Sequence, residues 1–393
     1  MDKIDELLTR GVENIYPSRE ALEKVLRSGK KLLLYQGFDP SAPSLHLGNY
    51  VGVLKLSQFQ ALGHEVIFLV GDFTGMIGDP TDKLASRKML TREQTRKNSE
   101  KYQDQTERIL KFTGPNPAKL MFNSEWNDLI SFKDLIEISS KFTAQQMLER
   151  DMFQKRIKEG KPIYLHELLY PVAQAIDSVK MDVDLELGGN DQTFNMLAGR
   201  TLMMSLKGKE KFVMTTKLLV DAKGDKVGKT TGNALFLDRP SEEFYGGIMS
   251  FPDDVLPLGF ELLTSVPMEE VRVMDFKAKP MELKKRLAFE VVKIIYGEEA
   301  AQKAQNNFEN VFQKKQSPEN LPEVKLATNL WEADQLLVKT GLVKSLSEAK
   351  RLLAQKAVEI NGKIINSQQL TINNGDTIRV GKNRFIRIRV DSL

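Results

Sequence analysis

The sequence predicts an α/β protein that opens with a parallel sheet, continues into a helical region and ends in a small α+β tail. In its first part, residues 32–38 form an apolar strand pattern, a helical pattern runs to about Leu62, and residues 65–71 form a second apolar strand pattern. Short apolar strands joined through a helix are typical of parallel sheets with right-handed crossovers. Residues 241–312 show helical patterns and no convincing strand, and the tail combines short helices with alternating strands.

The order of these elements divides the chain into five segments. Further helical patterns in the first segment lie at about 91–112, 132–158, 164–180 and 191–206, with strands at 119–123, 183–188 and 211–220. Helices in the tail are expected at about 331–340 and 346–356. The predicted segments are a Rossmann-like domain at 1–221, a mobile loop at 222–236, a helical domain at 237–312, a polar linker with two prolines at 313–328 and an α+β domain at 329–393.

Composition excludes several classes of protein. The 393 residues are 41% apolar and 28% charged, which is typical of a soluble globular chain. There is no cysteine, so disulfides, thiolate catalysis and cysteine-bound zinc are excluded, and the three histidines are too scattered for a histidine metal site. No apolar stretch approaches the roughly 18 residues of a membrane span, and the charged N-terminus does not resemble a signal peptide. We therefore expect a cytoplasmic protein with no membrane contact, no zinc and no other protein-bound metal.

The distribution of charge sets the tail apart from the rest of the chain. Residues 331–393 contain 11 Lys and Arg against 6 Asp and Glu, a net charge of +5, whereas the whole chain carries +4 and residues 1–330 therefore carry −1. A basic tail on a near-neutral body indicates contact with nucleic acid. The alternative is a basic surface that is only solvated.

Residues 39–49 form the first segment that indicates chemistry. They lie between the first strand and the first helix, at the carboxyl edge of the predicted sheet, where ligands bind in α/β proteins. Gly48 lets a ligand approach the backbone, and His46 precedes a helix N-terminus, which favours phosphate. For His46 alone, a turn with an incidental histidine is the simpler interpretation.

A second segment, residues 225–233, carries two lysines in a glycine-bounded loop. Lys226 and Lys229 are three residues apart and could place two ammonium groups on one polyphosphate, although a solvated loop would look the same. The end of the segment also matches a P-loop. We reject that interpretation because Lys223 stands where the P-loop spacing requires glycine.

A third set of residues lies on one face of a predicted helix. Tyr170, Gln174 and Asp177 are spaced i, i+4 and i+7, so their side chains share one face. Three hydrogen-bonding groups on such a face indicate either a polar pocket or a solvated stripe, and spacing alone does not choose between them.

These segments together resemble a known family. His46-Leu47-Gly48-Asn49 resembles the HIGH signature of class I aminoacyl-tRNA synthetases, and residues 226–230 resemble their KMSKS signature. Residues 170–177 resemble the tyrosine-binding helix of bacterial-type tyrosyl-tRNA synthetases, and the tail resembles a small RNA-binding module shared by many synthetases and a ribosomal protein. The resemblance covers nearly the whole chain. It implies a tyrosine–tRNA ligase that forms tyrosyl-adenylate and pyrophosphate from tyrosine and ATP, then transfers tyrosine to tRNA(Tyr).

The resemblance also implies a role for individual residues. Residues that hold tyrosine would be Tyr35 and Asp177 at the phenol, Asp79, Tyr170 and Gln174 at the ammonium group, and Gln192 in the loop after a strand. The implied catalytic set is His46, Lys83, Arg87, Lys226 and Lys229. The implied ATP set is Asp39, Ser41, His46, Gly48, Asn49, Gly189, Asp191, Lys226, Lys229 and Thr230. ATP would bring Mg²⁺ as a co-substrate, and no tightly bound cofactor is expected.

A homodimer is implied as well, with an interface at about 125–165, a helical anticodon-side domain at 237–312 and one tRNA across both subunits. Three places depart from the family pattern: Asn49, Val227-Gly228 and Thr193-Phe194. Two other functions stay open. A tryptophan-specific relative would lack the pair Tyr35 and Asp177. A non-catalytic RNA-binding protein would have no physical reason to keep His46, Lys226, Lys229 and Asp177 together.

Overall fold

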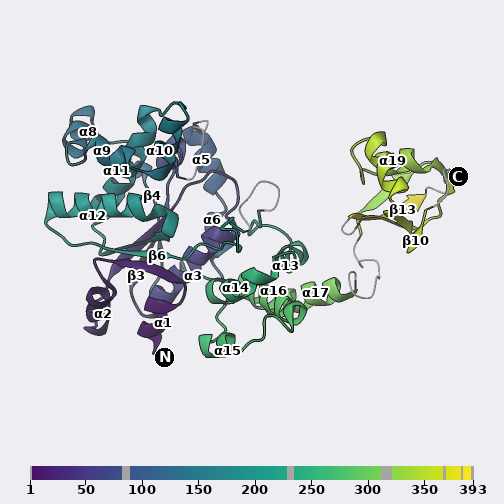
Figure 1. Ribbon diagram of the computed structural model, residues 1–393, viewed down its shortest axis with the longest axis horizontal. Coiled ribbons are helices and arrows are strands. Elements are labelled where there is room, and N and C mark those ends of the chain that lie inside the picture. Colours follow the sequence, from purple (N-terminus) through teal and green to yellow (C-terminus); the bar gives the residue numbers. More distant parts are fainter. Residues whose placement is uncertain are drawn as a thin grey trace. The chain divides into compact units, whose positions relative to one another are not determined.

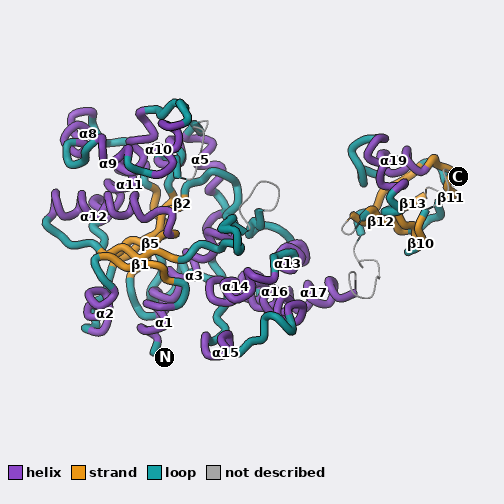
Figure 2. The backbone as a smooth tube through the Cα atoms, viewed as in Figure 1, coloured by secondary structure: helices purple, strands orange, loops and turns teal. Residues whose placement is uncertain are grey.

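The computed structural model describes residues 2–81, 89–227, 234–310, 321–365, 369–381 and 384–390. The chain forms two compact units, residues 1–301 and residues 302–393. Figure 1 shows the elements of each unit in the order of the sequence, and Figure 2 separates strands from helices. Each unit is described by itself.

A six-stranded sheet with the order β1-β6-β5-β2-β3-β4 forms the centre of the first unit. Its strands are β1 (Val12–Tyr16), β2 (Leu33–Phe38), β3 (Glu65–Val70), β4 (Lys119–Phe122), β5 (Leu185–Gly189) and β6 (Phe212–Thr216). All neighbouring pairs are parallel except β1, which runs antiparallel to β6 at the edge. The predicted parallel α/β sheet is thus confirmed. The chain leaves β2 on one side towards β3, and β5 lies on the other side, so a switch point lies between β2 and β5.

The inner strands form because their side chains are apolar on both faces. In β3, Val66 to Val70 are buried, and in β2 the ring of Phe38 stacks on Phe68 with centroids 4.3 Å apart. Continuous apolar runs of this kind suit a strand covered by helices on both sides. By contrast, β1 has half-buried and exposed residues only. That pattern explains why the sequence did not predict it.

Helices cover both faces of the sheet. The helices before and between the strands are α1 (Lys3–Thr9), α2 (Arg19–Arg27), α3 (Leu47–Ala61), α4 (Thr74–Ile77), α5 (Arg92–Ser99), α6 (Tyr102–Thr106), α7 (Ser124–Asn127), α8 (Phe132–Ser139), α9 (Ala144–Leu148), α10 (Asp151–Lys158), α11 (Leu165–Met181), the 3₁₀ turn η1 (Asn190–Gln192) and α12 (Thr193–Lys207). Figure 1 shows α11 and α12 on one side of the sheet and α1, α2 and α3 on the other. The helical pattern expected over 132–158 is divided into α8, α9 and α10, because Thr143 caps a new helix start.

Helices also make up the rest of the first unit. They are α13 (Ser241–Met249), the 3₁₀ turn η2 (Asp253–Val255), α14 (Leu256–Leu263), α15 (Met268–Arg272), α16 (Pro280–Tyr296) and α17 (Glu298–Phe308), whose last turns extend past residue 301. The buried guanidinium of Arg10 joins this region to the N-terminus. It donates to the carbonyl oxygens of Phe260, Thr264 and Val266 at 2.9, 2.5 and 2.8 Å. These carbonyls lie in the last turn of α14 and just after it, where a helix leaves acceptors without partners.

The second unit contains β7 (Glu323–Leu326), β8 (Leu330–Glu332), α18 (Ala333–Lys339), α19 (Leu346–Ala354), β9 (Val358–Ile360), β10 (Lys363–Ile364), β11 (Gln369–Thr371), β12 (Thr377–Val380) and β13 (Arg384–Val390). Five strands form one sheet in the order β10-β9-β12-β13-β7, and β8 pairs with β11. Leu336, Leu337, Ile378 and Ile388 belong to the core between helices and sheet. Both predicted tail helices are present.

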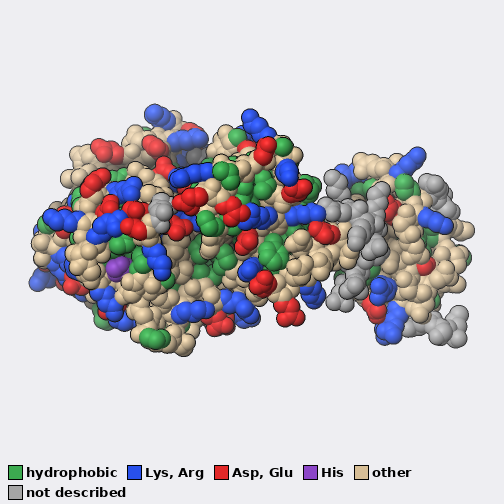
Figure 3. Space-filling view, turned by 90° about the horizontal axis from the view of Figure 1, so that it is seen from below, with side chains coloured by type: hydrophobic (Ala, Val, Ile, Leu, Met, Phe, Trp, Pro, Cys, Tyr) green, Lys and Arg blue, Asp and Glu red, His purple; other side chains and the backbone are tan. Residues whose placement is uncertain are grey.

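Two further properties concern the surface. Acidic and basic side chains are interspersed over the larger unit on the face shown in Figure 3, which agrees with the near-neutral charge of residues 1–330. In the part of the chain that the structure describes, no helix has the length and apolarity needed to cross a membrane.

Candidate active site

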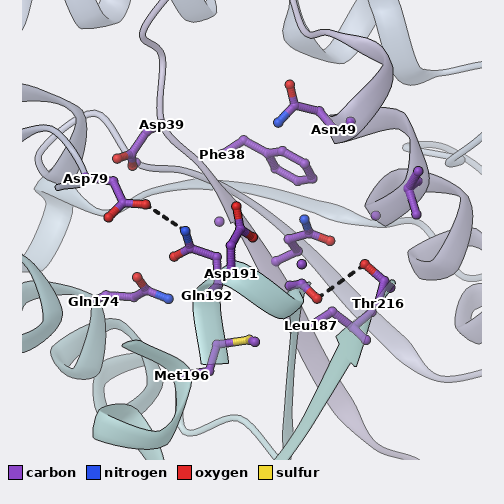
Figure 4. Close-up of a pocket in the computed structure, with 18 of the residues that line it drawn as sticks. Phe38, Asp39, Asn49, Asp79, Gln174, Leu187, Asp191, Gln192, Met196 and Thr216 are labelled. Atoms are coloured by element: carbon purple, nitrogen blue, oxygen red, sulfur yellow. Dashed lines mark hydrogen bonds between the residues drawn. The ribbon is translucent and has the colours of Figure 1, made fainter. Parts of the chain in front are cut away.

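A pocket of about 220 Å³ opens at the carboxyl ends of β2 and β5, where the sheet has its switch point. Figure 4 shows side chains from several elements meeting there. Of the residues that the sequence predicted for the site, the pocket brings together Tyr35, Asp39, Ser41, His46, Gly48, Asn49, Asp79, Tyr170, Gln174, Asp177, Gly189, Asp191, Gln192 and Lys226. Lys83, Arg87, Lys229 and Thr230 lie outside the described residues.

His46 begins helix α3 at the mouth of the pocket. Its Nδ1 accepts the backbone N–H of Asn49 at 3.2 Å, and Oδ1 of Asn49 accepts the backbone N–H of His46 at 3.0 Å. This reciprocal cap fixes the ring, and a neutral ring that accepts at Nδ1 carries its proton on Nε2. Asn49, one of the departures from the family pattern, therefore completes the cap that orients His46.

The segment around His46 pairs with the chain that follows the lysine loop. The backbone N–H of Leu47 donates to the carbonyl of Leu235 at 2.8 Å, and the N–H of Leu237 donates to the carbonyl of Leu45 at 2.8 Å. On the other side of the loop, Lys226 Nζ forms an ion pair with Asp191 at 2.8 Å. Residues 45–47, in the first signature segment, are thus adjacent to residues 235–237, which follow the lysine loop.

Acceptor groups gather at one end of the pocket. Tyr170 donates its hydroxyl to Asp39 Oδ2 at 2.8 Å, Gln192 Nε2 donates to Asp79 Oδ2 at 2.6 Å, and Gln174 Nε2 donates to Glu186 Oε1 at 2.9 Å. Figure 4 shows Gln192 reaching Asp79 and Gln174 beside them. The protons of Tyr170 and Gln174 are thus directed away, so lone pairs on their oxygens and on the carboxylate of Asp79 remain for a cation. Burial and the charge of Asp39 raise the pKa of Tyr170 well above its ordinary value, so it stays protonated.

The other end of the pocket is built around the buried carboxylate of Asp177. Trp126 Nε1 and Asn127 Nδ2 donate to its Oδ1 at 2.8 and 3.0 Å, and Asn123 Nδ2 donates to Oδ2 at 3.1 Å. Burial raises the pKa of Asp177 to about 8, although the three hydrogen bonds act in the opposite direction. Asp177 is therefore held in one geometry and has a proton to exchange near neutral pH.

Tyr35 completes this end of the pocket, but it does not bond to Asp177. Its hydroxyl lies 3.0 Å from Ser178 Oγ, on the neighbouring residue of α11. Burial first, then the carboxylates of Glu186 and Asp177, raise the pKa of Tyr35 well above its ordinary value. The pocket thus presents a hydroxyl and a carboxylate that are positioned by separate sets of partners.

The last two residues of β5 are glycines, and there is little room for a side chain at either position. A Cβ on Gly188 would lie 2.9 Å from Met196 Sδ, and one on Gly189 would lie 2.6 Å from Asp191 Oδ1. The departures nearby have structural roles and do not line the pocket. Thr193 Oγ1 donates to the carbonyl of Asn190 at 2.6 Å, and the ring of Phe194 lies 5.0 Å below the guanidinium of Arg150.

Sequence reasoning missed several residues of the site. Asn123, Trp126 and Asn127 reach Asp177 from the segment after β4, Glu186 lines the pocket, and Ser178 and Lys211 lie behind it. One signal was available: Glu186 is a charged residue inside an apolar strand pattern, which is rare without a buried partner. Gln36 was also missed, and its buried Oε1 accepts no hydrogen bond from the described residues. Among those residues, no group of three or more Asp, Glu or His side chains is placed to hold a metal ion.

The chain is similar to known proteins along nearly its whole length. Residues 27–313 match the tRNA synthetases class I (W and Y), and residues 333–378 match the S4 domain. The tyrosine–tRNA ligases of Carboxydothermus hydrogenoformans and Thermotoga maritima are 41% and 42% identical, each over 98% of this chain and 97% and 96% of the relative. A truncated mitochondrial tyrosyl-tRNA synthetase of Aspergillus nidulans has the same fold, with a TM-score of 0.65 over 79% of this chain and 94% of that one at 23% identity.

The raised pKa of Asp177 predicts a pH dependence of stability. The folded protein keeps this proton up to about pH 8, whereas the unfolded chain, at the ordinary value of 3.8, has lost it. Stability that is present below pH 4 is therefore lost as the pH rises to 8. Asp177→Asn should remove this loss, so that the melting temperature of the wild type falls relative to the variant by a few degrees or more between pH 5 and pH 8.

Thermal denaturation at constant ionic strength measures the effect. The slope is compared and not the absolute melting temperature, because Asn123 Nδ2 loses its acceptor in the variant. Equal slopes for the two proteins would show that Asp177 ionises at its ordinary pKa.

Proposed function

This chain belongs to the class I tRNA synthetase family of the tryptophan and tyrosine enzymes, and we propose how its pocket selects tyrosine and activates it. It is a tyrosine–tRNA ligase, an ATP-dependent aminoacyl-tRNA synthetase. Neither alternative, a tryptophan enzyme or a non-catalytic RNA-binding protein, is favoured. The proposed selection of tyrosine rests on one observation, which is that the buried Asp177 and the hydroxyl of Tyr35 line the same pocket. The proposed activity assigns the chain to the cytoplasm, where charged tRNA is used.

Phenol recognition depends on matching one donor and one acceptor in a buried place. The substrate hydroxyl donates to Asp177 in its ionised form, which this bond and the three side-chain donors favour against the effect of burial, and it accepts from Tyr35. Three donors already orient Asp177, so little ordering is needed when tyrosine binds. Phenylalanine fills the same volume but offers no donor to Asp177 and no acceptor to Tyr35, and a buried hydrogen bond that is not made is costly.

The acceptor end of the pocket binds the substrate ammonium group. Tyr170 and Gln174 each direct a proton elsewhere and retain oxygen lone pairs, and the carboxylate of Asp79 adds a negative charge. Gln192 holds Asp79 in place from the turn after β5. With the ammonium and the phenol fixed at opposite ends, the substrate carboxylate is oriented towards the side where His46 and Lys226 lie.

ATP is bound beside this carboxylate, and Mg²⁺ arrives with its phosphates. Asp39, Ser41, Gly48, Asn49, Gly189, Asp191 and Thr230 form the nucleotide side of the site. The tyrosine carboxylate attacks the α-phosphorus, pyrophosphate leaves, and the terminal adenosine hydroxyl of tRNA(Tyr) then displaces the nucleotide. No protein nucleophile is needed, so catalysis rests on orientation and on positive charge at the phosphates. His46, Lys83, Arg87, Lys226 and Lys229 provide that charge and its hydrogen bonds.

Lys226 forms an ion pair that can be exchanged for contacts with ATP. Its Nζ pairs with Asp191, with side-chain exposures of 24% and 15%. This partly exposed pair is weak enough to exchange when a polyphosphate offers more charge. Asp191 then becomes available to the ribose, and the lysine to the phosphates.

The selectivity for tyrosine tests the proposed function. Asp177→Ala should lower the ratio of kcat/KM for tyrosine over phenylalanine by about 100-fold or more, since a hydrogen bond to a charged group in a buried place is worth up to about 3 kcal/mol. Pyrophosphate exchange with the full-length protein and each amino acid measures the ratio. Asp184→Ala, on the chain between α11 and β5 and outside the pocket lining, is the control. An unchanged ratio for Asp177→Ala would refute the assignment of the phenol site.

The chain also forms a homodimer through residues at about 125–165. Of the fourteen large apolar side chains that are strongly exposed in the described residues, six lie in this stretch: Leu129, Phe132, Ile136, Ile157, Tyr164 and Leu165. Helices α8, α9 and α10 lie together beside α11 in Figure 1. A concentration of exposed apolar side chains of this kind is typical of an interface between protein chains.

Phe132→Asp should therefore convert the dimer into a monomer. The ring is 78% exposed, so the change should not unfold the protein, but it would place a charge in the interface. Analytical ultracentrifugation at micromolar concentration gives the mass. Val273→Asp is the matched control, because Val273 is 82% exposed but lies outside this stretch. A dimer of undiminished stability with Phe132→Asp would rule out this surface.

Binding of tRNA depends on the basic tail as well as the body. Four of the tail's basic side chains are paired within the tail: Lys350 with Asp334, Arg379 with Glu359, Arg384 with Glu348 and Arg389 with Glu323. Six others make no ion pair among the described residues: Lys339, Lys344, Arg351, Lys356, Lys363 and Arg387. These six are the groups offered to phosphates.

A chain ending near residue 320 should form tyrosyl-adenylate at close to the full-length rate but charge tRNA poorly. The tail has its own core, and none of the pocket residues belongs to it. Each lost phosphate contact should also reduce the dependence of tRNA affinity on salt. Filter binding between 50 and 200 mM salt and aminoacylation assays measure the two effects. Full charging activity of the shortened chain would show that the tail does not bind tRNA.

A further inference from the structure

A fully buried lysine lies behind the pocket, where neither the reaction nor the fold obviously requires one. Lys211 precedes strand β6, and its Nζ donates to Ser178 Oγ at 2.9 Å and to the carbonyl of Met196 at 3.1 Å. It also pairs with the carboxylate of Glu186, which is 1% exposed and lines the pocket. Burial lowers the pKa of Lys211, and the charge of Glu186 acts against this effect.

Such a pair is a poor way to stabilise a fold. Removing two charges from water costs about as much as their attraction returns, and apolar side chains of the same size often give a more stable protein. Helix α12 has a glycine where it passes the pair of Lys211 and Glu186. A Cβ on Gly199, in the middle of α12, would lie 2.6 Å from Lys211 Nζ and 2.8 Å from Ser178 Oγ. Glycine inside a helix costs roughly 0.5–1 kcal/mol relative to alanine, so space for the pair is kept at a cost.

One branch of contacts leads from Lys211 to the phenol end of the pocket. The ammonium group can only donate, so it occupies a lone pair of Ser178 Oγ. Ser178 lies 3.0 Å from the hydroxyl of Tyr35. Ser178 has one proton and two acceptors within reach, the hydroxyl of Tyr35 and, at 3.3 Å, Glu186 Oε2, with which the ammonium group of Lys211 already pairs. When Ser178 donates to Tyr35, the proton of Tyr35 is directed at the bound phenol, whose own proton goes to Asp177. All hydrogen bonds then run in one direction, from an ammonium group to a carboxylate, and each strengthens the next.

A second branch leads to the other end of the pocket. Glu186 Oε1 accepts from Gln174 Nε2 at 2.9 Å. Because a carboxylate only accepts, this contact fixes which way the Gln174 amide is turned, and Oε1 of Gln174 is left as the acceptor for an ammonium group. The same ion pair therefore acts on both ends of the substrate site.

We propose that Lys211 and Glu186 form a positioning pair that sets the hydrogen-bond direction of the pocket and thereby its preference for tyrosine over phenylalanine. Lys211 acts through Ser178 and Tyr35, which we call the Lys211 relay, and Glu186 acts through Gln174. Neither residue is catalytic. The inference rests on the proposed recognition of the phenol by Tyr35 and Asp177.

The double variant Lys211→Met/Glu186→Gln tests the pair without leaving a lone buried charge. Pyrophosphate exchange with the full-length protein should show KM for tyrosine raised about 10-fold and the ratio of kcat/KM for tyrosine over phenylalanine lowered about 10-fold. KM for ATP should change less than about 2-fold, since neither residue lies on the nucleotide side. A loss of stability with an unchanged ratio would mean that the pair is only structural and would overturn the proposal.

Ser178→Ala keeps both charges and removes the link, so it tests the relay even if the double variant does not fold. It should lower the same ratio by about 3- to 10-fold, and it should have no further effect in a Tyr35→Phe protein. An equal effect with and without the Tyr35 hydroxyl would overturn the relay.

Lys55→Met is the control for the loss of a buried lysine. Lys55 Nζ donates to the carbonyls of Leu7 and Arg10 at 3.1 and 2.8 Å and does not line the pocket, so this variant should lose stability but keep the ratio. Should the wild-type protein fail to activate tyrosine, the proposed function itself falls. A wild type that is selective, with variants whose ratio is unchanged, refutes only the positioning pair.

Discussion

The Asp177 carboxylate lies in the interior of the first unit, and the arrangement of the pocket follows from that burial. A charge there needs donors, and they come from three side chains on the segment that follows β4. Their reach requires β4 to lie next to β3, with α11 covering the carboxyl end of the sheet. The order of the strands and the short helix α7 therefore together supply the donors that a buried carboxylate needs in the proposed tyrosine site.

The two signature segments depend on a simpler device, which is backbone pairing. Residues 45–47 and 235–237 exchange main-chain hydrogen bonds, and His46 is oriented by the cap with Asn49. Main-chain bonds do not depend on side-chain identity. Side chains in these segments can therefore vary while residues 45–47 and 235–237 keep their relative positions.

Much of the fold and the site follows from local sequence patterns. Local spacing predicts the apolar runs of β2 and β3 and the two glycines at the end of β5. It also predicts the helix face shared by Tyr170, Gln174 and Asp177. The partners of Asp177 could not be predicted, because Trp126 lies 51 residues away in the sequence and no local pattern links the two residues. The pairing of Lys211 with Glu186 likewise appears only when β5 and β6 are neighbours. Edge strand β1 was not predicted because its residues are exposed or half-buried and therefore lack an apolar pattern.

Arg10 has a consequence for how the chain is made. Its guanidinium is held by carbonyls about 250 residues further on, and β1 beside it pairs with β6 about 200 residues further on. A ribosome builds the chain from the N-terminus, so the pairing with β6 must wait until just over half of the protein has been synthesised, and the contacts of Arg10 until roughly two-thirds. Contacts between such distant residues are also the slowest to form. The first residues to leave the ribosome thus complete their contacts late, and a protein cut short before α14 would leave the guanidinium of Arg10 without these main-chain acceptors.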